Sequence, residues 1–314
     1  MIRPVKFVCL CCLALLTALL STATLAEIYR WVDDKGKVHF SDRKQDDDSQ
    51  TTVELNVPTS QWKPLDIQVD ATHVNLSEAE HLRITTDVNN VYRFFDQKLY
   101  FDIYKTVPVK IQIFHDEQSY NAYISSRSKV KHGRTSGMYF KKDNAIAVFM
   151  KEDRELTFRT IKHETSHAIV DTLTPFVPTW LNEGLAENME TLIAEGDNLF
   201  LEHHHNNFDA VKALEKKRGL MGIREFFSLK SNDWFSKNRD GGYRLQVQTG
   251  EITRMLLSSR PGLSFIIRLI HAYERGDRTI AVYVVEQEYT GGIVVLELNW
   301  YRWLERTKFP KISL

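Results

Sequence analysis

The chain has 314 residues, and its 41 lysines and arginines are balanced by 41 aspartates and glutamates, giving a formal net charge of +0. This balance gives no electrostatic basis for binding nucleic acid or an anionic membrane surface. A hydrophobic content of 43% is that of an ordinary globular protein rather than a disordered or fibrous one.

Residues 1–26 have the pattern of a secretory signal peptide. A basic start with Arg3 and Lys6 precedes an apolar run over residues 7–20, and small residues follow up to Ala26. We expect cleavage after Ala26; an uncleaved membrane anchor is the alternative, which the shortness of the apolar run disfavours. All three cysteines lie in this segment, so the mature chain offers only histidines and carboxylates as zinc ligands.

Residues 27–48 predict a small β-hairpin module. Ile28–Val32 and Val38–Ser41 alternate in polarity, and residues 33–36 between them read as a turn. The segment resembles a small domain of unknown function that follows the signal peptide in many Gram-negative envelope proteins. The matching residues are Tyr29, Trp31, Asp33, Gly36, His39, Phe40, Ser41 and Asp42. The resemblance implies a periplasmic location and no catalysis. Residues 49–63 are polar and are interpreted as a linker.

Residues 64–314 predict one catalytic domain of the α+β class: a small mixed β-sheet, then an active-site helix, then a largely helical C-terminal half. A capping box at Ser77 and Glu80 opens a helix that we expect to run to about Phe101. Its predicted buried face is Leu82, Val88, Val91, Tyr92 and Phe95. A strand at 109–114, a short helix at 117–124 and a hairpin of Gly137–Phe140 with Ala145–Phe149 follow.

The predicted helix at 156–173 contains the sequence His163-Glu164-Thr165-Ser166-His167. Residues four apart share a helix face, so both imidazoles can reach one metal ion, and Glu164 can act as general base toward a metal-bound water. Prolines 175 and 178 end this helix, and a second helical segment at 180–194 places Glu183 near its start. Two histidines and a glutamate form an open, catalytic type of zinc site. A solvated polar helix face is the alternative.

Ala168 follows the first of these two segments, and the second reads Pro178-Thr179-Trp180-Leu181-Asn182-Glu183-Gly184-Leu185-Ala186-Glu187. Together the two segments resemble the gluzincin clan of zinc metallopeptidases. The resemblance is specifically to bacterial peptidase MA-like domains. It implies one Zn²⁺ per chain with His163, His167 and Glu183 as ligands and Glu164 as catalytic base. By the same resemblance, Glu187 orients a ligand histidine from behind, and an exposed solvated charge is the alternative for it.

The resemblance implies two further features of the site. An edge strand, Gly137–Phe140 or Ala145–Phe149, would pair with the substrate backbone. A tyrosine or histidine from the helical half would stabilise the oxyanion; Tyr243 is our candidate and His271 the alternate.

After residue 194 the pattern predicts helices at 208–217, 223–229, 243–258 and 263–273. We expect the triplet His203-His204-His205 to be an exposed loop, because three consecutive residues point in different directions and rarely bind one ion.

The sequence therefore predicts a secreted zinc metallopeptidase that acts on a peptide or protein substrate in the cell envelope, in the periplasm of a Gram-negative bacterium. One alternative is a catalytically silent zinc-binding envelope protein. Another is an adaptor that contacts an envelope partner through residues 27–48. The intact Glu164 favours the enzyme, but the substrate and the choice between exo- and endopeptidase do not follow from the sequence.

Overall fold

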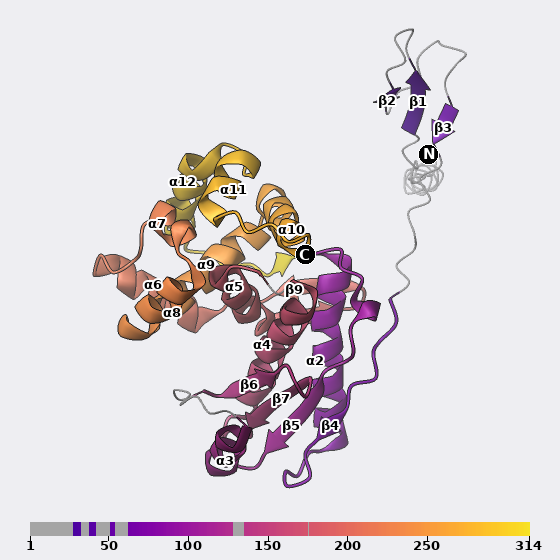
Figure 1. The fold of residues 1–314 in the computed structure, drawn as a ribbon, viewed down its shortest axis with the longest axis vertical. Helices are drawn as coiled ribbons and strands as arrows, with labels where there is room; N and C mark the ends of the chain where they lie inside the picture. The colour runs from indigo at the N-terminus through magenta and orange to yellow at the C-terminus, as the bar shows by residue number, and fades with distance from the viewer. Residues whose placement is uncertain (1–27, 33–37, 42–50, 54–61, 128–134, 175) are drawn as a thin grey trace, which may run out of the picture. The chain divides into compact units, whose positions relative to one another are not determined.

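The computed structural model describes residues 28–32, 38–41, 51–53, 62–127, 135–174 and 176–314. The chain divides into two units, residues 1–61 and 62–314 (Figure 1). The predicted signal segment, the turn at 33–36 and most of the predicted linker lie outside the described residues. No helix in the described ranges combines the length and the apolar character needed to cross a membrane.

The first unit contains a three-stranded antiparallel sheet in the order β2-β1-β3. Strand β1 (Ile28–Val32) pairs with β2 (Val38–Ser41), with Trp31 opposite His39, which confirms the predicted hairpin. Strand β3 (Thr51–Val53) pairs with the other edge of β1, so the linker prediction was wrong for these three residues. Their polar composition does not indicate a strand. The segment is a strand because it pairs with β1.

The second unit is α+β, as predicted, and begins with a four-stranded mixed sheet in the order β4-β5-β7-β6 (Figure 1). Strands β4 (Val69–Asp70), β5 (Lys110–Phe114) and β7 (Ala145–Phe149) are parallel, and β6 (Gly137–Phe140) is antiparallel to β7. The predicted hairpin of β6 and β7 is confirmed. Strand β6 lies at the edge of this sheet and β7 lies inside it, so of the two candidates only β6 can act as an edge strand.

Helices α2 (Glu78–Gln97) and α4 (Arg154–Leu173) pack against each other beside the sheet. The capping box is confirmed: the Glu80 amide donates to Ser77 Oγ at 3.3 Å, and the Ser77 amide donates to Glu80 Oε2 at 2.9 Å. The helix ends four residues before the predicted Phe101. Leu82 is 67% exposed, contrary to prediction, because Ile84, and not Leu82, continues the helical spacing of Val88 and Val91. The 3₁₀ helix η1 (Ile103–Lys105) and helix α3 (Glu117–Arg127) complete this half.

Helix α5 (Thr179–Met189) follows α4, and the chain then forms a hairpin instead of the helix predicted to residue 194. Strands β8 (Leu192–Glu195) and β9 (Asn198–Leu201) are antiparallel, and β10 (Ile312–Ser313) pairs with β9. A two-residue turn begins at Gly196, whose φ of +59° is a conformation that glycine adopts without a steric penalty.

The C-terminal half is helical, as predicted. It contains α6 (His205–Lys216), α7 (Ile223–Ser228), α8 (Ser231–Asp240), α9 (Arg244–Leu257), α10 (Arg260–Glu274), α11 (Ala281–Glu288) and α12 (Gly292–Leu304). We did not predict α8, α11 and α12. Helix α9 is the central element of this half, since it packs against α5, α6 and α10 and is almost entirely buried. Because α5 and α9 are in contact, the helical half packs directly against the helix that carries the second segment of the predicted motif.

Candidate metal centre

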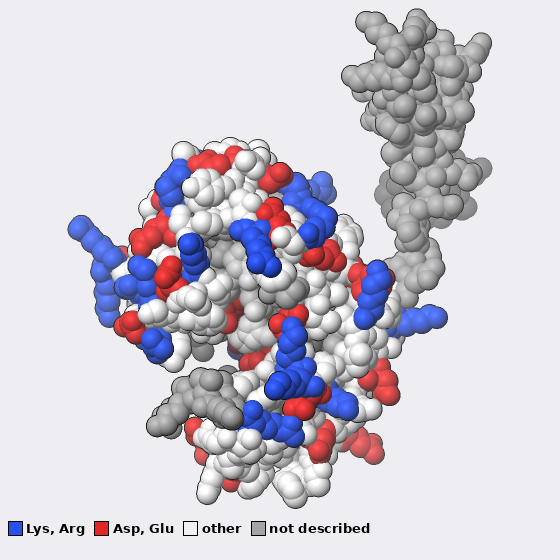
Figure 2. All heavy atoms as spheres, viewed as in Figure 1, with Lys and Arg blue, Asp and Glu red and all other residues white. Residues whose placement is uncertain are grey.

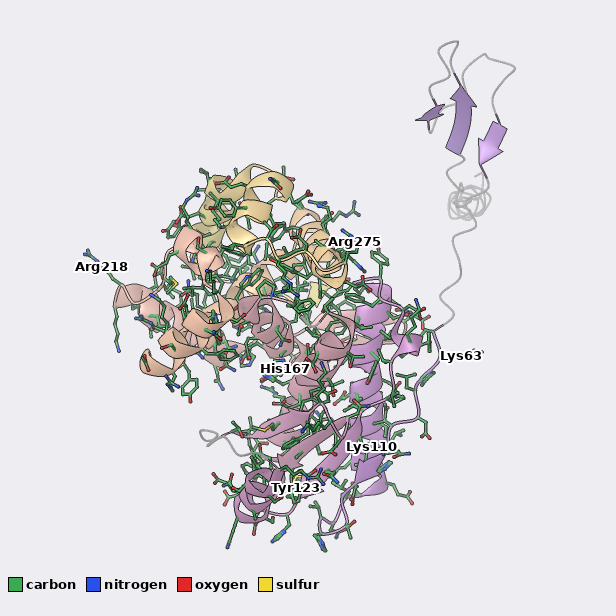
Figure 3. The ribbon with its side chains drawn as sticks, viewed as in Figure 1. Lys63, Lys110, Tyr123, His167, Arg218 and Arg275 are labelled. Carbon is green, nitrogen blue, oxygen red and sulfur yellow. The ribbon has the colours of Figure 1, made fainter. Side chains whose placement is uncertain are left out.

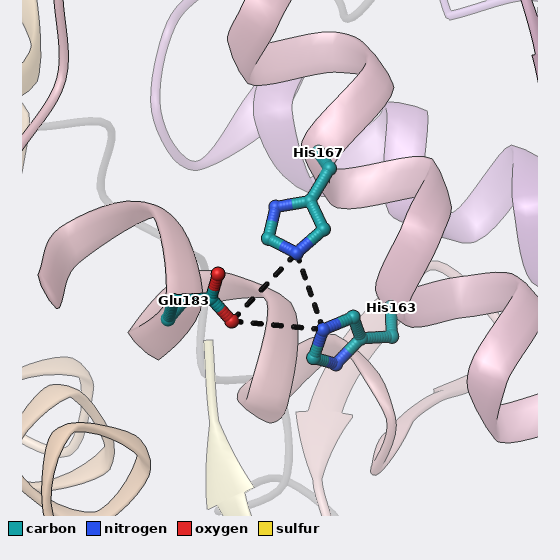
Figure 4. Close-up of side chains that lie close together, drawn as sticks. All are labelled: His163, His167 and Glu183. Carbon is teal, nitrogen blue, oxygen red and sulfur yellow. Dashed lines mark hydrogen bonds and ion pairs between the residues drawn. The ribbon is translucent and has the colours of Figure 1, made fainter. Parts of the chain in front are cut away.

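Two helices bring the predicted ligands together (Figure 4). Helix α4 carries His163 and His167, whose Nε2 atoms are 3.2 Å apart. Helix α5 carries Glu183, whose Oε2 lies 3.9 Å from His163 Nε2 and 3.8 Å from His167 Nε2. The three donor atoms therefore converge on one point, as the sequence predicted from the helical spacing and the turn between the two segments.

This donor set fits a zinc ion. Zinc binds histidine nitrogen and carboxylate oxygen at about 2.0 to 2.2 Å in tetrahedral sites, which places neighbouring ligand atoms about 3.3 Å apart. The observed separations of 3.2, 3.8 and 3.9 Å are close to this edge length. All three residues line an open cleft, so a fourth position would face solvent or substrate.

A hydrogen bond at Nδ1 orients the ring of each histidine. His163 Nδ1 lies 2.9 Å from Glu190 Oε1, and His167 Nδ1 lies 3.0 Å from Asn182 Oδ1. An oxygen acceptor at Nδ1 favours the tautomer that carries its proton there, which leaves the Nε2 lone pair free for a metal. Both histidines therefore present the correct nitrogen to the shared point.

The prediction that Glu187 orients a ligand histidine was wrong, since Glu190 makes that hydrogen bond. Glu187 instead accepts hydrogen bonds from Asn207 Nδ2 at 2.7 Å and from Gln246 Nε2 at 2.8 Å. It ties α5 to α6 and α9. Glutamates 183, 187 and 190 share one helical face by their spacing, and this signal was available to identify Glu190 from the sequence.

The electrostatics of His163 follow from this arrangement. Burial opposes protonation of the ring, but the hydrogen bond and charge of Glu190, with the charges of Glu187 and Glu164, outweigh it and raise the pKa of His163 to about 10. For Glu190, burial favours the neutral acid, yet its hydrogen bonds to His163 and His204 prevail and lower its pKa. A metal cation that binds His163 must therefore displace a proton.

The cleft has a volume of about 1020 Å³ and is lined from both halves of the second unit. Residues 135–139, which include part of β6, and residues of α4 line one side, and Phe235 and Tyr243 line it from the helical half. Figure 3 labels His167 between the sheet and the helices, and Figure 2 shows acidic and basic side chains interspersed over the visible face. A substrate in this cleft would contact β6 and the three candidate ligands together.

Glu164 lines the same cleft, as its predicted role requires. A Cβ atom at Gly137 would lie 3.0 Å from Glu164 Cγ and 2.6 Å from Thr160 Cγ2. Glycine at this position thus lets the edge strand approach α4 closely, beside the candidate general base.

Tyr243 and its alternate His271 have different surroundings. Tyr243 lines the cleft, is 52% exposed, and has a left-handed φ of +64°, which is uncommon for a non-glycine residue. His271 Nε2 donates to the Leu99 carbonyl oxygen at 2.7 Å, and the His271 ring lies 4.6 Å from that of Phe101. It does not line the cleft, so the alternate assignment was wrong.

The histidine triplet is not the exposed loop that we predicted. His204 Nε2 lies 3.4 Å from Glu190 Oε2, and its Nδ1 accepts from the Asn207 amide at the start of α6. The His203 ring stacks on Phe309 at 4.1 Å, and only His205 is exposed. None of the three belongs to a candidate metal-binding group of the described residues. Packing against Glu190 and the C-terminal segment partly buries the other two, and the local sequence does not encode these contacts.

Comparison with family models matches residues 15–64 to a domain of unknown function, DUF4124. This domain is typical of Gram-negative envelope proteins, as the sequence of the hairpin module indicated. The match covers the N-terminal unit and does not reach the metal centre. No curated protein matches the chain.

Proposed function

We propose that this protein is a zinc metallopeptidase of the Gram-negative cell envelope, with the gluzincin arrangement of ligands. The observation that carries the proposal is the convergence of His163, His167 and Glu183, with donor atoms 3.2 to 3.9 Å apart, in a cleft that Glu164 also lines. Burial of two imidazoles and a carboxylate around one point is costly unless a metal or a proton network satisfies them.

Zinc at this point would activate a water and polarise the scissile carbonyl. Glu164 accepts the proton of the attacking water and returns it to the leaving amine. Glu190 and Asn182 hold the two imidazoles in the ligating tautomer. Tyr243, which lines the cleft from the helical half, would donate a hydrogen bond to the oxyanion.

The edge strand supports an extended peptide as the substrate. Strand β6 ends the sheet, and Gly137, Met138 and Tyr139 of this strand line the cleft. Unpaired backbone groups on an edge strand can bind a peptide as an added strand. Such pairing would hold the scissile bond beside Glu164 without requiring a particular side chain.

The alternative is a zinc-binding envelope protein without turnover, which the position of Glu164 in the cleft disfavours. Zinc content of the untagged mature protein tests the site, with the His163→Ala, His167→Ala double variant beside it. We expect about one zinc per chain, lost in the double variant. No zinc in the wild type would contradict the proposal.

Hydrolysis of casein and of a fluorogenic peptide library tests the reaction. Because general base catalysis contributes about 10² to 10⁴-fold, Glu164→Gln should keep its zinc and lose at least 100-fold in rate. Glu155→Gln, a change on the same helix but outside the lining of the cleft, should keep both the zinc and the rate. Zinc binding with no hydrolysis above that of Glu164→Gln would favour the silent protein.

A further inference from the structure

A second cavity, of about 260 Å³, lies between the end of α12, the C-terminal segment and His203. It shares no lining residue with the cleft of the metal centre. Its lining residues are His203, Arg254, Ser258, Trp303, Arg306, Phe309, Pro310, Lys311, Ile312 and Ser313. Every charged residue among them is basic, and the wall contains no aspartate or glutamate.

Arg254 is the buried cation of this cavity, with 3% of its surface exposed. Its guanidinium donates to Thr191 Oγ1 at 3.3 Å and to Leu201 O at 3.2 Å, both of which are neutral oxygens. No ion pair found among the described residues includes Arg254. Glu251, one turn earlier, attracts it from farther away and accepts from Trp303 Nε1 at 3.0 Å. A buried charge normally has a paired counter-charge, so this one is incompletely neutralised.

Arg306 adds a second cation without a paired carboxylate. Its guanidinium lies 4.0 Å above the Trp303 ring, and no acidic group of the described chain forms an ion pair with it. Lys311 stands at the rim and pairs with Glu195, outside the cavity, at 2.6 Å. The planar guanidinium group of arginine matches phosphate and carboxylate oxygens with two parallel hydrogen bonds.

Three aromatic rings, those of His203, Trp303 and Phe309, form part of the remaining wall. The rings of His203 and Phe309 stack at 4.1 Å with an interplanar angle of 16°, and Trp303 is buried beside them. Burial, with the positive charges of His205 and Arg254, lowers the pKa of His203 to about 4, so its ring is neutral at neutral pH. Apolar walls of this kind reduce the local dielectric and strengthen the attraction of the arginines for an anion.

We propose that this cavity is an anion-binding site for a small ligand that carries a phosphate or carboxylate group. Its volume lies below the range of about 300 to 1,000 Å³ that is usual for sites of drug-sized molecules, which favours a small ligand. The site is independent of the metal centre and of the proposed peptidase activity.

Calorimetric titration of the zinc-loaded mature protein with inorganic phosphate tests the site. We expect one phosphate per chain and at least tenfold weaker binding in Arg306→Ala, a surface change that leaves the core intact. Arg302→Ala, the matched control one turn earlier on α12, should bind as the wild type does. Competition with acetate then distinguishes the ligands: displacement of phosphate indicates that carboxylates also bind.

Three outcomes would overturn the proposal. One is the absence of any binding of phosphate or acetate. Another is an equal effect of Arg306→Ala and Arg302→Ala, which would indicate general attraction to surface charge. The third is binding that survives in Arg306→Ala but is lost in His163→Ala, His167→Ala, which would place the phosphate at the metal centre.

Discussion

The hydrogen bond between His163 and Glu190 orients a proposed ligand from behind, and its loss should weaken metal binding. A glutamine at 190 can still accept from Nδ1 but lacks the negative charge that makes the imidazole a better ligand. Because such partners contribute about 10 to 100-fold in metal affinity, we expect Glu190→Gln to bind zinc weaker by that factor in a chelator competition assay. Glu305→Gln, an exposed change, serves as control, and equal affinity of the two variants would contradict the role of Glu190.

A buried carboxyl on α9 makes stability depend on pH. Burial raises the pKa of Glu251, although the hydrogen bond from Trp303 and the charge of Arg254 oppose the shift. The Glu251 carboxyl thus keeps its proton to a higher pH in the folded chain than in the unfolded chain. The protonated form therefore stabilises the fold at low pH, and this stabilisation is lost as pH rises above the usual carboxyl range. Glu251→Gln keeps an acceptor for Trp303 and has no such dependence.

We therefore expect the melting temperature of Glu251→Gln, relative to wild type, to become more favourable as pH rises from about 4.5 to 7. Calorimetry across this range measures the difference. A difference that is constant with pH, or that moves the other way, would show that the Glu251 carboxyl is not perturbed in the folded state.

At the scale of elements, the approach of β6 to α4 depends on a residue without a side chain. An alanine Cβ at 137 would meet Thr160 Cγ2 at 2.6 Å and Val148 Cγ1 at 3.0 Å, so the strand or the helix must shift. Overpacking of this kind costs about 1 to 3 kcal/mol, and the shift would also move Glu164.

Gly137→Ala should thus lower stability by about 1 to 3 kcal/mol in denaturant unfolding and reduce the rate of any Glu164-dependent hydrolysis. The matched control is Gly222→Ala, where φ is −61° and a Cβ meets no atom within 4 Å. We expect that change to stay within about 0.5 kcal/mol. Equal stability of the two variants would mean that the close contact at 137 relaxes without cost.

At the scale of the whole molecule, the candidate metal centre belongs entirely to the second unit. All candidate ligands and their hydrogen-bond partners lie in residues 62–314. We expect a fragment of these residues to unfold cooperatively and to bind about one zinc, as measured by calorimetry and metal analysis. A fragment that does not fold would show that residues 62–314 need the N-terminal unit, and one that folds without binding zinc would contradict the proposed site.

Features that depend on contiguous residues could be predicted from the sequence alone. Helical spacing places His163 and His167 on one face, the capping box starts α2, and alternation marks the hairpin of β6 and β7. The turn at Gly196 is equally local: a glycine followed by an aspartate between two apolar stretches indicates a hairpin, although we predicted a helix up to residue 194. In each case the backbone geometry of a few neighbouring residues sets which side chains share a face.

Features that depend on packing between distant segments became visible only in the three-dimensional structure. Glu190 rather than Glu187 reaches His163 because α6 and α9 supply Asn207 and Gln246 as partners for Glu187. Of the two candidate strands only β6 lies at a sheet edge, because strand order, and not strand sequence, puts it there. Arg254, far along the chain, lines a cavity with the C-terminal segment. Contacts of this kind arise when the elements assemble, since burial and strand order are properties of the whole fold.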